Sequence, residues 1–332
     1  MTELMEGLAA DTVGEAPVDP AEPLVDIRKL SVRFRTADGV VRALSDVDLR
    51  MWPGDVVVLV GESGSGKTVL AHAILRLLPM NAEVTGAVHF GGQDLLTLPD
   101  RALRAVRGRH IALIPQSAST ALDPVRRIGG QLLEWARLRG IAEAEARPRL
   151  DRRLESLGLS FGGVARRYAH QLSGGMQQRV VNAGSLVNTP DLVLADEPTH
   201  GLDSSLVDVT AEQLLAVAAE GSALLVITHD LRLAEKLGGR LALLYASSLV
   251  ELRSTAAFFA EPAHPYGRGL LGALIERGGV PIPGMSPELS ALPPGCPFAP
   301  RCPSVLDECL GSIPAEHAVD GGWTRCVLHA AR

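Results

Sequence analysis

The chain has 332 residues, 46% of them hydrophobic, and can therefore bury the core of one large or two modest domains. Its formal net charge of -6 provides no general attraction to nucleic acid or to an anionic membrane surface. Apolar runs such as 56–60 and 223–227 are far shorter than the roughly 20 residues that a membrane-spanning helix needs. Any work at a membrane is therefore expected to depend on partner proteins.

The N-terminal part of the chain reads as a leader followed by a small sheet. Residues 1–23 are acidic, contain no basic residue and carry three prolines, whereas a signal peptide needs a basic start and an apolar run. We predict a disordered leader over 1–23. From Leu24 to Arg50 aliphatic and polar residues alternate around the turn Ala37-Asp38-Gly39, which predicts a pair of antiparallel strands.

Three continuous aliphatic runs of strand length follow, at 56–60, 192–195 and 224–227. Runs that are apolar on both faces are typical of buried parallel strands in an α/β sheet. Between the first two, the segment 122–171 is rich in Arg, Glu, Leu and Ala, which predicts a helical insertion. We expect Pro148 and the pair Gly162-Gly163 to interrupt its helices.

The first aliphatic run leads into Gly61-Glu62-Ser63-Gly64-Ser65-Gly66-Lys67-Thr68, which fits the phosphate-binding pattern G-x-x-x-x-G-K-[ST]. The glycines let backbone N–H groups converge on phosphate oxygens, Lys67 reaches the terminal phosphates and the Thr68 hydroxyl can bind magnesium. A chance match is expected only on the order of a few times per thousand such chains. The helix that follows can extend to Leu78, before Pro79.

Two acidic residues, Asp196 and Glu197, follow the second aliphatic run. Asp196 could bind the magnesium ion, and Glu197 could polarise the water that attacks the phosphate. Paired acids after a strand are equally compatible with a polar loop or a helix cap. The phosphate-binding pattern earlier in the chain favours the catalytic interpretation.

A second candidate anion site lies at Leu172-Ser173-Gly174-Gly175-Met176-Gln177-Gln178. Ser173 stands at a predicted helix start, and Gly174 and Gly175 leave backbone N–H groups accessible. In isolation, Ser173 would be an ordinary helix N-cap and the glycines a turn.

Together these motifs resemble the nucleotide-binding subunits of ABC transporters, whose signature sequence is L-S-G-G-[QM]. The resemblance covers roughly Leu24 to Ser254. It implies an α/β P-loop NTPase (RecA-like) core over 24–254, with an antiparallel β subdomain and a helical signature subdomain at about 117–180. Two such cassettes sandwich two ATP molecules in this family, so Ser173, Gly174 and Gly175 of one subunit complete the site of the other.

Further site residues follow from the resemblance. It implies that Gln116 is the γ-phosphate sensor and that His229 is the switch histidine. It also implies that Asp203 is the dimer-contacting aspartate and that Phe34 stacks on adenine. Gln116 would also bind magnesium, together with Thr68 and Asp196, and the catalytic set would be Lys67, Gln116, Glu197 and His229. Taken alone, Gln116 would be a loop glutamine, His229 a capping or core histidine and Phe34 a core residue.

The C-terminal segment 255–332 is dense in proline and predicts an irregular extension. Its stretches 263–271 and 295–303 resemble the extension of oligopeptide, dipeptide and nickel importers. The resemblance implies a peripheral subunit at the cytoplasmic face of the membrane. Its expected partners are a second ATPase, commonly a different paralogue, two transmembrane permease subunits and an extracytoplasmic substrate-binding protein, with no nucleic acid. A nickel or metal-chelate importer, an exporter cassette and a soluble non-transport ABC ATPase remain alternatives.

All four cysteines lie in this extension, at Cys296, Cys302, Cys309 and Cys326. Their spacing matches neither a ferredoxin run nor a zinc ribbon, and so it does not name a metal. Related chains are associated with an iron–sulfur cluster, so we favour a structural 4Fe-4S cluster over zinc, and zinc over unligated thiols.

Several positions depart from the family pattern. The segment Thr199-His200-Gly201-Leu202-Asp203 has His-Gly where a small or hydroxyl pair followed by Ala is usual. Asn182, Gly184 and Ser185 replace the usual helix formers, and a glycine inside a helix costs about 1 kcal/mol relative to alanine. The turn Ala246-Ser247 lacks the usual glycine. These positions put the local geometry in question and leave the catalytic set intact.

Overall fold

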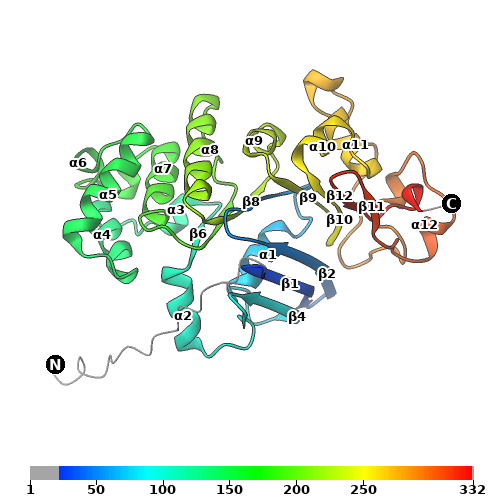
Figure 1. Cartoon of the computed structure of the whole chain (residues 1–332), viewed down its shortest axis with the longest axis horizontal. Coiled ribbons are helices and arrows are strands. Elements are labelled where there is room, and N and C mark those ends of the chain that lie inside the picture. The colour runs from blue at the N-terminus through cyan, green and yellow to red at the C-terminus, as the bar shows by residue number, and fades with distance from the viewer. Residues whose placement is uncertain (1–21, 331–332) are drawn as a thin grey trace.

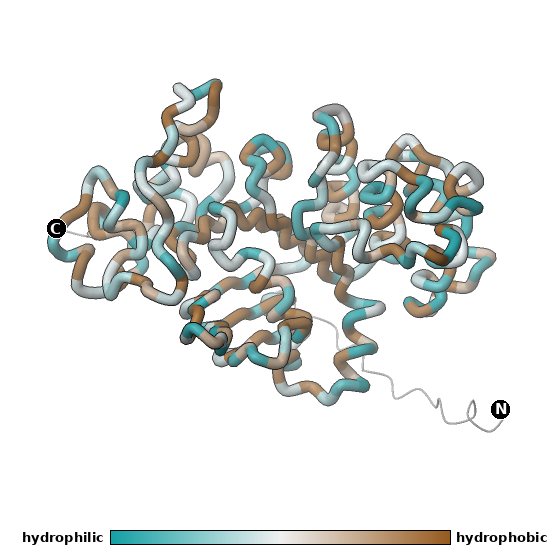
Figure 2. The backbone as a smooth tube through the Cα atoms, turned by 180° about the vertical axis from the view of Figure 1, so that it is seen from behind, coloured by the Kyte–Doolittle hydropathy of each residue, from teal (hydrophilic) through white to brown (hydrophobic). Residues whose placement is uncertain are grey.

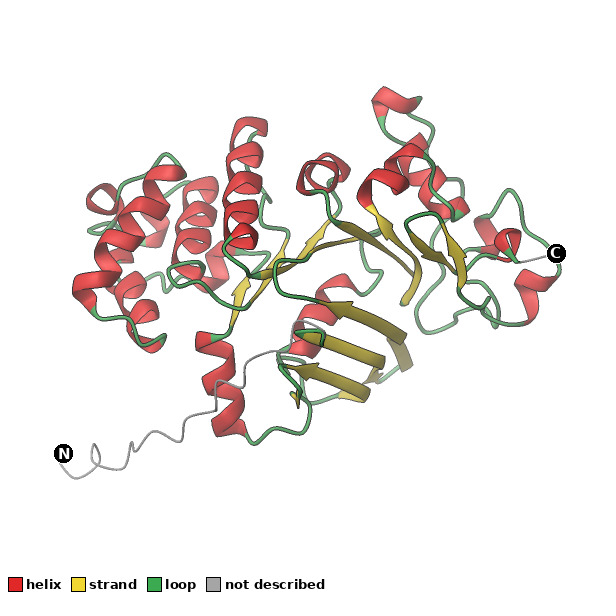
Figure 3. Cartoon of the chain, in the orientation of Figure 1, coloured by secondary structure: helices red, strands yellow, loops and turns green. Residues whose placement is uncertain are grey.

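Residues 22–330 are described by a computed structural model, which arranges them around two sheets (Figures 1 and 3). Residues 1–21 of the predicted leader lie outside the described residues. Within 22–330, the main sheet has eight strands in the order β11-β12-β10-β9-β3-β8-β7-β6. Their bounds are His317–Val319, Gly322–Thr324, Ser248–Ser254, Arg240–Tyr245, Val56–Val60, Ala223–Thr228, Leu192–Asp196 and Ile111–Ile114.

The predicted antiparallel sheet is present and is larger than expected. It has the order β2-β1-β4-β5, with β1 at Val25–Thr36, β2 at Gly39–Met51, β4 at Ala82–Phe90 and β5 at Gln93–Asp94. Strands β1 and β2 pair at the predicted turn, with Thr36 opposite Gly39. Strand β4, which the sequence analysis did not identify, pairs with the other edge of β1.

Strand β3 lies near the middle of the main sheet, and its side chains contribute to the apolar core on both faces of the sheet. It pairs in parallel with β8 on one side and β9 on the other, and β7 and β6 continue the parallel order. Its side chains alternate between two apolar layers: Leu59 packs toward the antiparallel sheet and α1 (Lys67–Ile74), and Val58 packs toward α8 (Ser204–Ala219) and α9 (Leu231–Leu237). The central strands are correspondingly hydrophobic in Figure 2. The predicted α/β P-loop fold is confirmed.

A helical subdomain lies at the opposite end of the main sheet from the C-terminal extension (Figure 1). It has its own apolar core around Leu132, Leu150 and Val180. Its helices are α3 (Ala118–Ala121), α4 (Ile128–Leu138), α5 (Glu143–Ser156), α6 (Phe161–Val164) and α7 (Gly174–Ser185), and α2 (Asp100–Arg109) precedes β6.

Three predictions about helix ends are wrong. The pair Gly162-Gly163 does not interrupt a helix but lies inside the short helix α6, which Ser160 caps by accepting the N–H of Gly163. Pro148 does not interrupt a helix but lies inside α5, in its second turn. Proline has no N–H, so α5 lacks one backbone hydrogen bond there, and the packing of α5 in the helical subdomain compensates for this loss. Helix α1 ends at Ile74 and does not extend to Leu78. Arg76 takes a left-handed φ of 49°, its N–H bonds to Ala73 O, and the N–H of Leu77 bonds to His72 O, which is the geometry of a Schellman cap.

The C-terminal extension is more regular than its proline content suggested. Strand β12 pairs antiparallel with β10, Trp323 opposite Leu252, and so lengthens the main sheet. Its other elements are α10 (Thr255–Ala260), α11 (Pro265–Gly272), α12 (Glu308–Gly311) and the short 3-10 turns η2 (Ile275–Arg277), η3 (Ala299–Arg301) and η4 (Val327–His329). No helix in the described part of the chain is both long and apolar enough to cross a membrane.

The unusual residues of α7 have packing roles. A Cβ on Gly184 would lie 2.6 Å from side-chain atoms of both Leu132 and Trp135, so glycine permits the close approach of α7 and α4. The Asn182 amide donates to Pro198 O, and the Ser185 hydroxyl donates to Leu113 O. The helix therefore loses propensity at these positions and gains contacts to the strands and loops beneath it.

We predict that Leu59→Ala lowers the stability of the chain by about 3 kcal/mol, because Leu59 is fully buried in the central strand and its truncation leaves a cavity. Thermal unfolding of the full chain measures the effect. Leu77→Ala is the control, since Leu77 is 46% exposed. Equal shifts of the two midpoints would contradict the central role of β3.

Candidate nucleotide-binding site

A pocket of about 700 Å³ opens where β3, β6, β7 and β8 end. Because β3, β8, β7 and β6 are neighbours in one parallel order, their carboxyl ends meet at the same edge of the sheet. The residues that line the pocket are Phe34, Val41, Ala43, Ser63, Gly64, Gly66, Lys67, Thr68, Val69, Gln116, Glu197, His200, His229 and Leu289.

Nine of the residues predicted from the sequence line this pocket, and these are Phe34, Ser63, Gly64, Gly66, Lys67, Thr68, Gln116, Glu197 and His229. Asp196 is buried next to Glu197 at the end of β7. Gly61, Glu62 and Ser65 belong to the same loop without lining the pocket. Segments that are far apart in the sequence are therefore brought together as the motif series predicted.

Residues 61–68, the predicted phosphate loop, need glycine at two positions because other backbone segments lie against the loop. A Cβ on Gly61 would lie 2.1 Å from Leu244 O, and one on Gly66 would lie 2.2 Å from Ala43 O. Gly66 also has a φ of 108°, which side chains rarely adopt. The loop is further fixed by Ser247, whose N–H donates to Ser65 O at 3.1 Å. The glycine-free turn Ala246-Ser247 forms with left-handed φ values of 40° and 71°.

Lys67 is buried, and its ammonium group donates to the loop's own carbonyls, Gly61 O and Glu62 O, at 2.8 Å each. Burial lowers the pKa of Lys67, and the carboxylates of Glu197, Asp196 and Glu62 oppose that shift. The charged form of Lys67 is thus stabilised by three acidic side chains around the pocket, and phosphate oxygens could take the place of the carbonyl acceptors.

Asp196 suits a cation. Its side chain is buried, and within residues 22–330 its Oδ1 has no hydrogen-bond donor. Burial raises the pKa of Asp196, while a hydrogen bond from Thr68 opposes the shift. A buried carboxylate oxygen without a donor is unfavourable unless a cation compensates it, so the pair of Thr68 and Asp196 fits the predicted magnesium site.

Glu197 and His229 are hydrogen-bonded across the ends of β7 and β8. The His229 Nδ1 lies 2.7 Å from Glu197 Oε1, and the Thr228 hydroxyl donates to Glu197 Oε2 at 3.3 Å. Glu197 has a φ of 49°, a strained conformation for a residue with a side chain, and its N–H donates to Ile227 O. The carboxylate is therefore held at the rim of the pocket by two side-chain contacts, and the backbone of Glu197 is fixed by a third.

The predicted signature residues and Asp203 do not line this pocket. Ser173 caps α7 by accepting the N–H of Met176, and Ser173 and Gly174 are exposed. Asp203 caps α8 by accepting the N–H of Leu206. Ser173 and Gly174 are thus exposed at the start of α7, where a second molecule could contact them.

Five pocket residues were not predicted as site residues, and these are Val41, Ala43, Val69, His200 and Leu289. His200 had been noted only as a departure from the family pattern, although its position three residues after Glu197 was a usable signal. Leu289 belongs to the C-terminal extension and reaches the pocket because Arg42 N donates to Leu289 O at 2.9 Å. No local sequence pattern links Leu289 to β2.

The four cysteines form no disulfide. Burial, and then the neighbouring thiols of Cys309, Cys326 and Cys302, raises the pKa of Cys296 to about 11. Within residues 22–330, however, no group of three or more His, Cys, Asp or Glu side chains is arranged to hold a metal ion. The predicted iron–sulfur or zinc site therefore receives no support from the geometry.

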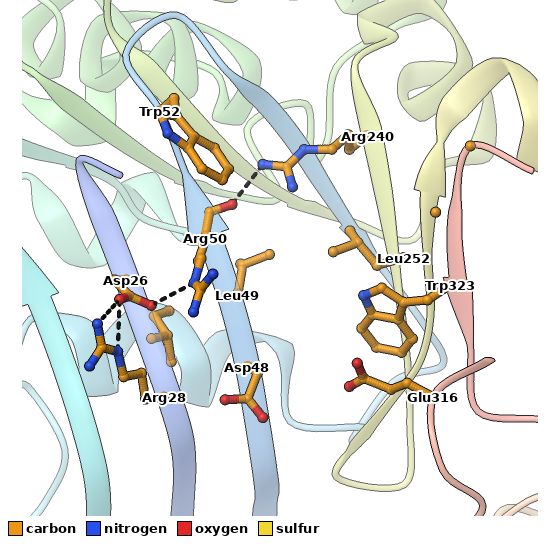
Figure 4. A pocket seen from close by; sticks show the side chains of 13 residues that line it. Asp26, Arg28, Asp48, Leu49, Arg50, Trp52, Arg240, Leu252, Glu316 and Trp323 are labelled. Carbon is orange, nitrogen blue, oxygen red and sulfur yellow. Dashed lines mark hydrogen bonds and ion pairs between the residues drawn. The ribbon is translucent and has the colours of Figure 1, made fainter. Parts of the chain in front are cut away.

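A second pocket lies away from the phosphate loop, between the antiparallel sheet and the C-terminal extension (Figure 4). Trp52 and Trp323 line it from different elements. Its charges are engaged with nearby groups: Arg28 and Arg50 contact Asp26, while Arg240 and Glu316 pair with residues outside the lining, Asp55 and Arg325. Asp48, the other charged residue of the lining, accepts the N–H of Lys29 at 3.0 Å.

Comparisons with known proteins identify the family of the chain. The family model described as ABC transporter matches residues 44–200, and the model described as oligopeptide/dipeptide transporter, C-terminal region, matches 250–309. An oligopeptide transport ATP-binding protein OppD from Salmonella typhimurium is 36% identical over 325 residues, which cover 96% of this chain and 97% of that protein. The chain belongs to the ABC transporter ATP-binding family.

Other relatives of this ABC transporter family member differ in length. The OppD of Escherichia coli is 35% identical over 92% of this chain and 93% of its own. The Mycobacterium bovis OppD is 39% identical over 88% of this chain, yet the match spans only 49% of that longer protein. Among solved structures, the ATP-binding cassette MJ0796, a dimer bound to ADP and Pi, has a TM-score of 0.63 and 26% identity over 70% of this chain and 98% of its own.

We predict that Gly66→Ala weakens nucleotide binding by at least about tenfold, because the added Cβ would collide with Ala43 O and require a strained φ. Titration of the full chain with a fluorescent ATP analogue measures this. Gly91→Ala is the control: Gly91 also has a positive φ, of 54°, but an added Cβ there has nothing within 4 Å. Unchanged affinity in Gly66→Ala would contradict the assigned loop geometry.

Proposed function

We propose that this chain is the ATP-binding and ATP-hydrolysing subunit of an ABC importer of oligopeptides or dipeptides. The observation that supports it best is the convergence of the phosphate loop, the Asp196-Glu197 pair, Gln116 and His229 at one edge of the sheet. The match of 250–309 to the oligopeptide/dipeptide transporter C-terminal region, and the names of the OppD relatives, support the peptide substrate.

Hydrolysis by this chain would rely on positioning and electrostatics. The backbone amides from Ser63 to Gly66 and the Lys67 ammonium group would bind the phosphates and neutralise their charge. Glu197 would accept a hydrogen bond from the attacking water and orient it, and His229, already 2.7 Å from Glu197, would face the γ phosphate. Phe34 would pack on the adenine ring.

Magnesium, when bound, would stabilise the negative charge that develops on the β and γ phosphates. Thr68 and Asp196 would hold it, and Gln116, at the end of β6, would approach from the rim of the pocket. The proposal that Thr68 and Asp196 hold magnesium depends on two features. The Oδ1 atom of Asp196 has no hydrogen-bond donor within 22–330, and the Asp196 carboxylate is hydrogen-bonded to Thr68.

A complete site would need a second cassette. Ser173, Gly174 and Gly175 are separate from the Lys67 pocket within one chain, and α7 directs its N-terminal amides outward. We propose that a partner ATPase, identical or paralogous, brings its own signature residues onto this pocket, with Asp203 at the contact. Two permease subunits and a substrate-binding protein would complete the importer at the cytoplasmic face of the membrane.

Nickel or metal-chelate import remains the main alternative, because the ATPase site carries no information about the cargo. A soluble non-transport ABC ATPase is less well supported, since the extension at 250–309 matches a transporter region.

We predict that Glu197→Gln lowers ATP turnover by the assembled transporter about a hundredfold or more while ATP binding persists, because the amide cannot polarise water. Steady-state turnover and uptake of a labelled peptide and of nickel are measured together. Glu212→Gln, an exposed residue on α8, is the control. Wild-type turnover in Glu197→Gln would contradict the assigned chemistry, and nickel uptake without peptide uptake would reassign the cargo.

We further propose that the four cysteines bind a structural metal centre, with a 4Fe-4S cluster favoured over zinc. The proposal rests on four free thiols, three of which, Cys296, Cys302 and Cys309, lie in the region that matches the transporter extension, while Cys326 follows it. It requires the thiols to take up an arrangement that differs from the one described for 22–330, where no metal-holding group is formed.

Iron and zinc analysis of anaerobically purified full chain is expected to find one metal near stoichiometry, and Cys309→Ser is expected to lose it and to unfold at a lower temperature. Absence of both metals at stoichiometric levels would leave the thiols as unligated core residues.

A further inference from the structure

Three side chains of the C-terminal extension contact Glu62 of the phosphate loop. The N–H of Glu62 donates to the Tyr266 hydroxyl at 2.8 Å. One terminal nitrogen of Arg301, Nη1, lies 3.0 Å from both carboxylate oxygens of Glu62, and the Ser286 hydroxyl bonds to the same carboxylate. Glu62 occupies an unspecified position of the G-x-x-x-x-G-K-[ST] pattern, so the motif itself does not explain its presence.

Arg301 is buried and held by several groups. Its side chain is only 6% exposed, its Nε donates to Pro283 O at 2.9 Å, and its Nη1 lies 3.1 Å from the Tyr245 hydroxyl. Its guanidinium group also lies 5.9 Å from the ring centres of Tyr245 and Phe298. These contacts hold the Arg301 side chain in place independently of Glu62, whereas both partners of a surface ion pair are flexible.

The charge of Glu62 reaches the nucleotide pocket. Its carboxylate is one of three that stabilise charged Lys67, and Lys67 bonds to the Glu62 carbonyl. An unneutralised carboxylate in the loop that binds phosphates would repel the nucleotide. Arg301 compensates this charge and, with Tyr266, fixes both the side chain and the backbone of Glu62.

We infer that Arg301 is a positioning residue of the nucleotide site: it neutralises Glu62 and thereby holds the phosphate loop in its binding conformation. The inference rests on the proposed nucleotide site. Arg301 does not line the pocket, and so it acts through the loop and makes no contact with ATP. The extension that matches a transporter-specific region thus contributes to ATP affinity.

A purely structural role for Arg301 makes a different prediction. If Arg301 only anchored the segment 282–286, its loss would reduce the fraction of folded protein and lower kcat at unchanged KM. If it neutralises Glu62, its loss raises the KM for ATP, and removal of the Glu62 charge restores that KM.

The test measures KM and kcat for ATP in the assembled transporter, with thermal midpoints for each variant. We expect Arg301→Ala to raise KM about tenfold, the size expected for losing a buried charge-assisted hydrogen bond, with kcat within about threefold of wild type because Glu197 and His229 are untouched. Arg301→Lys should recover part of the loss. Adding Glu62→Gln to Arg301→Ala should return KM to within about threefold of wild type.

Arg325→Ala is the matched control. Arg325 also precedes a cysteine in the extension, pairs with a glutamate, Glu316, at 3.0 Å and lies over an aromatic ring, that of Trp323. It is expected to leave KM unchanged. Should Arg301→Ala not fold, Arg301→Gln, which keeps a side-chain donor without the charge, provides the same comparison with and without Glu62→Gln.

An unchanged KM in Arg301→Ala would overturn the inference, as would a raised KM that Glu62→Gln does not reverse. Lys67→Ala separates this result from the proposed function. If Lys67→Ala abolishes ATP binding while the Arg301 variants behave as wild type, only the role of Arg301 fails. If Lys67→Ala binds and hydrolyses ATP normally, the nucleotide site itself is wrongly assigned.

Discussion

The parallel pairing of β3 with β8, and of β8 with β7, is the constraint on which the rest of the structure depends. It places the ends of these strands at one edge, so the glycine-rich loop 61–68, the Asp196-Glu197 pair and His229 lie close together. The strands are buried on both faces, which fixes their register through two separate apolar layers. The relative positions of the residues in the pocket are therefore determined by the register of the strands in the sheet.

Most of the core and much of the site could be predicted because their signals are local. Residues 56–68 contain the sequence patterns of a strand, a glycine-rich turn and a helix start, and the acidic pair directly follows a strand. Helix ends were less predictable, because Pro148 is tolerated through packing and the end of α1 depends on the left-handed backbone of Arg76. The roles assigned to individual side chains remain predictions.

The parts that could not be predicted involve contacts between distant segments. Leu289 reaches the pocket through a backbone bond to β2, and β12 joins the main sheet at β10, which no composition signal indicated. Gly184 seemed unfavourable by helix propensity alone and is explained only by the proximity of α4. Departures from a family pattern can thus reflect packing against a neighbour that the sequence does not reveal.

The ion pair of Glu62 and Arg301 joins residues 239 positions apart. On the ribosome, Glu62 is therefore made and exposed long before its counter-charge exists. A growing chain that has passed the last parallel strand, β9, can already assemble the sheet and the glycine-rich turn, yet still carries an uncompensated acid beside them. Full nucleotide affinity would then arise only after Arg301 has been synthesised and has paired with Glu62, which would delay ATP capture by a chain that still lacks this arginine.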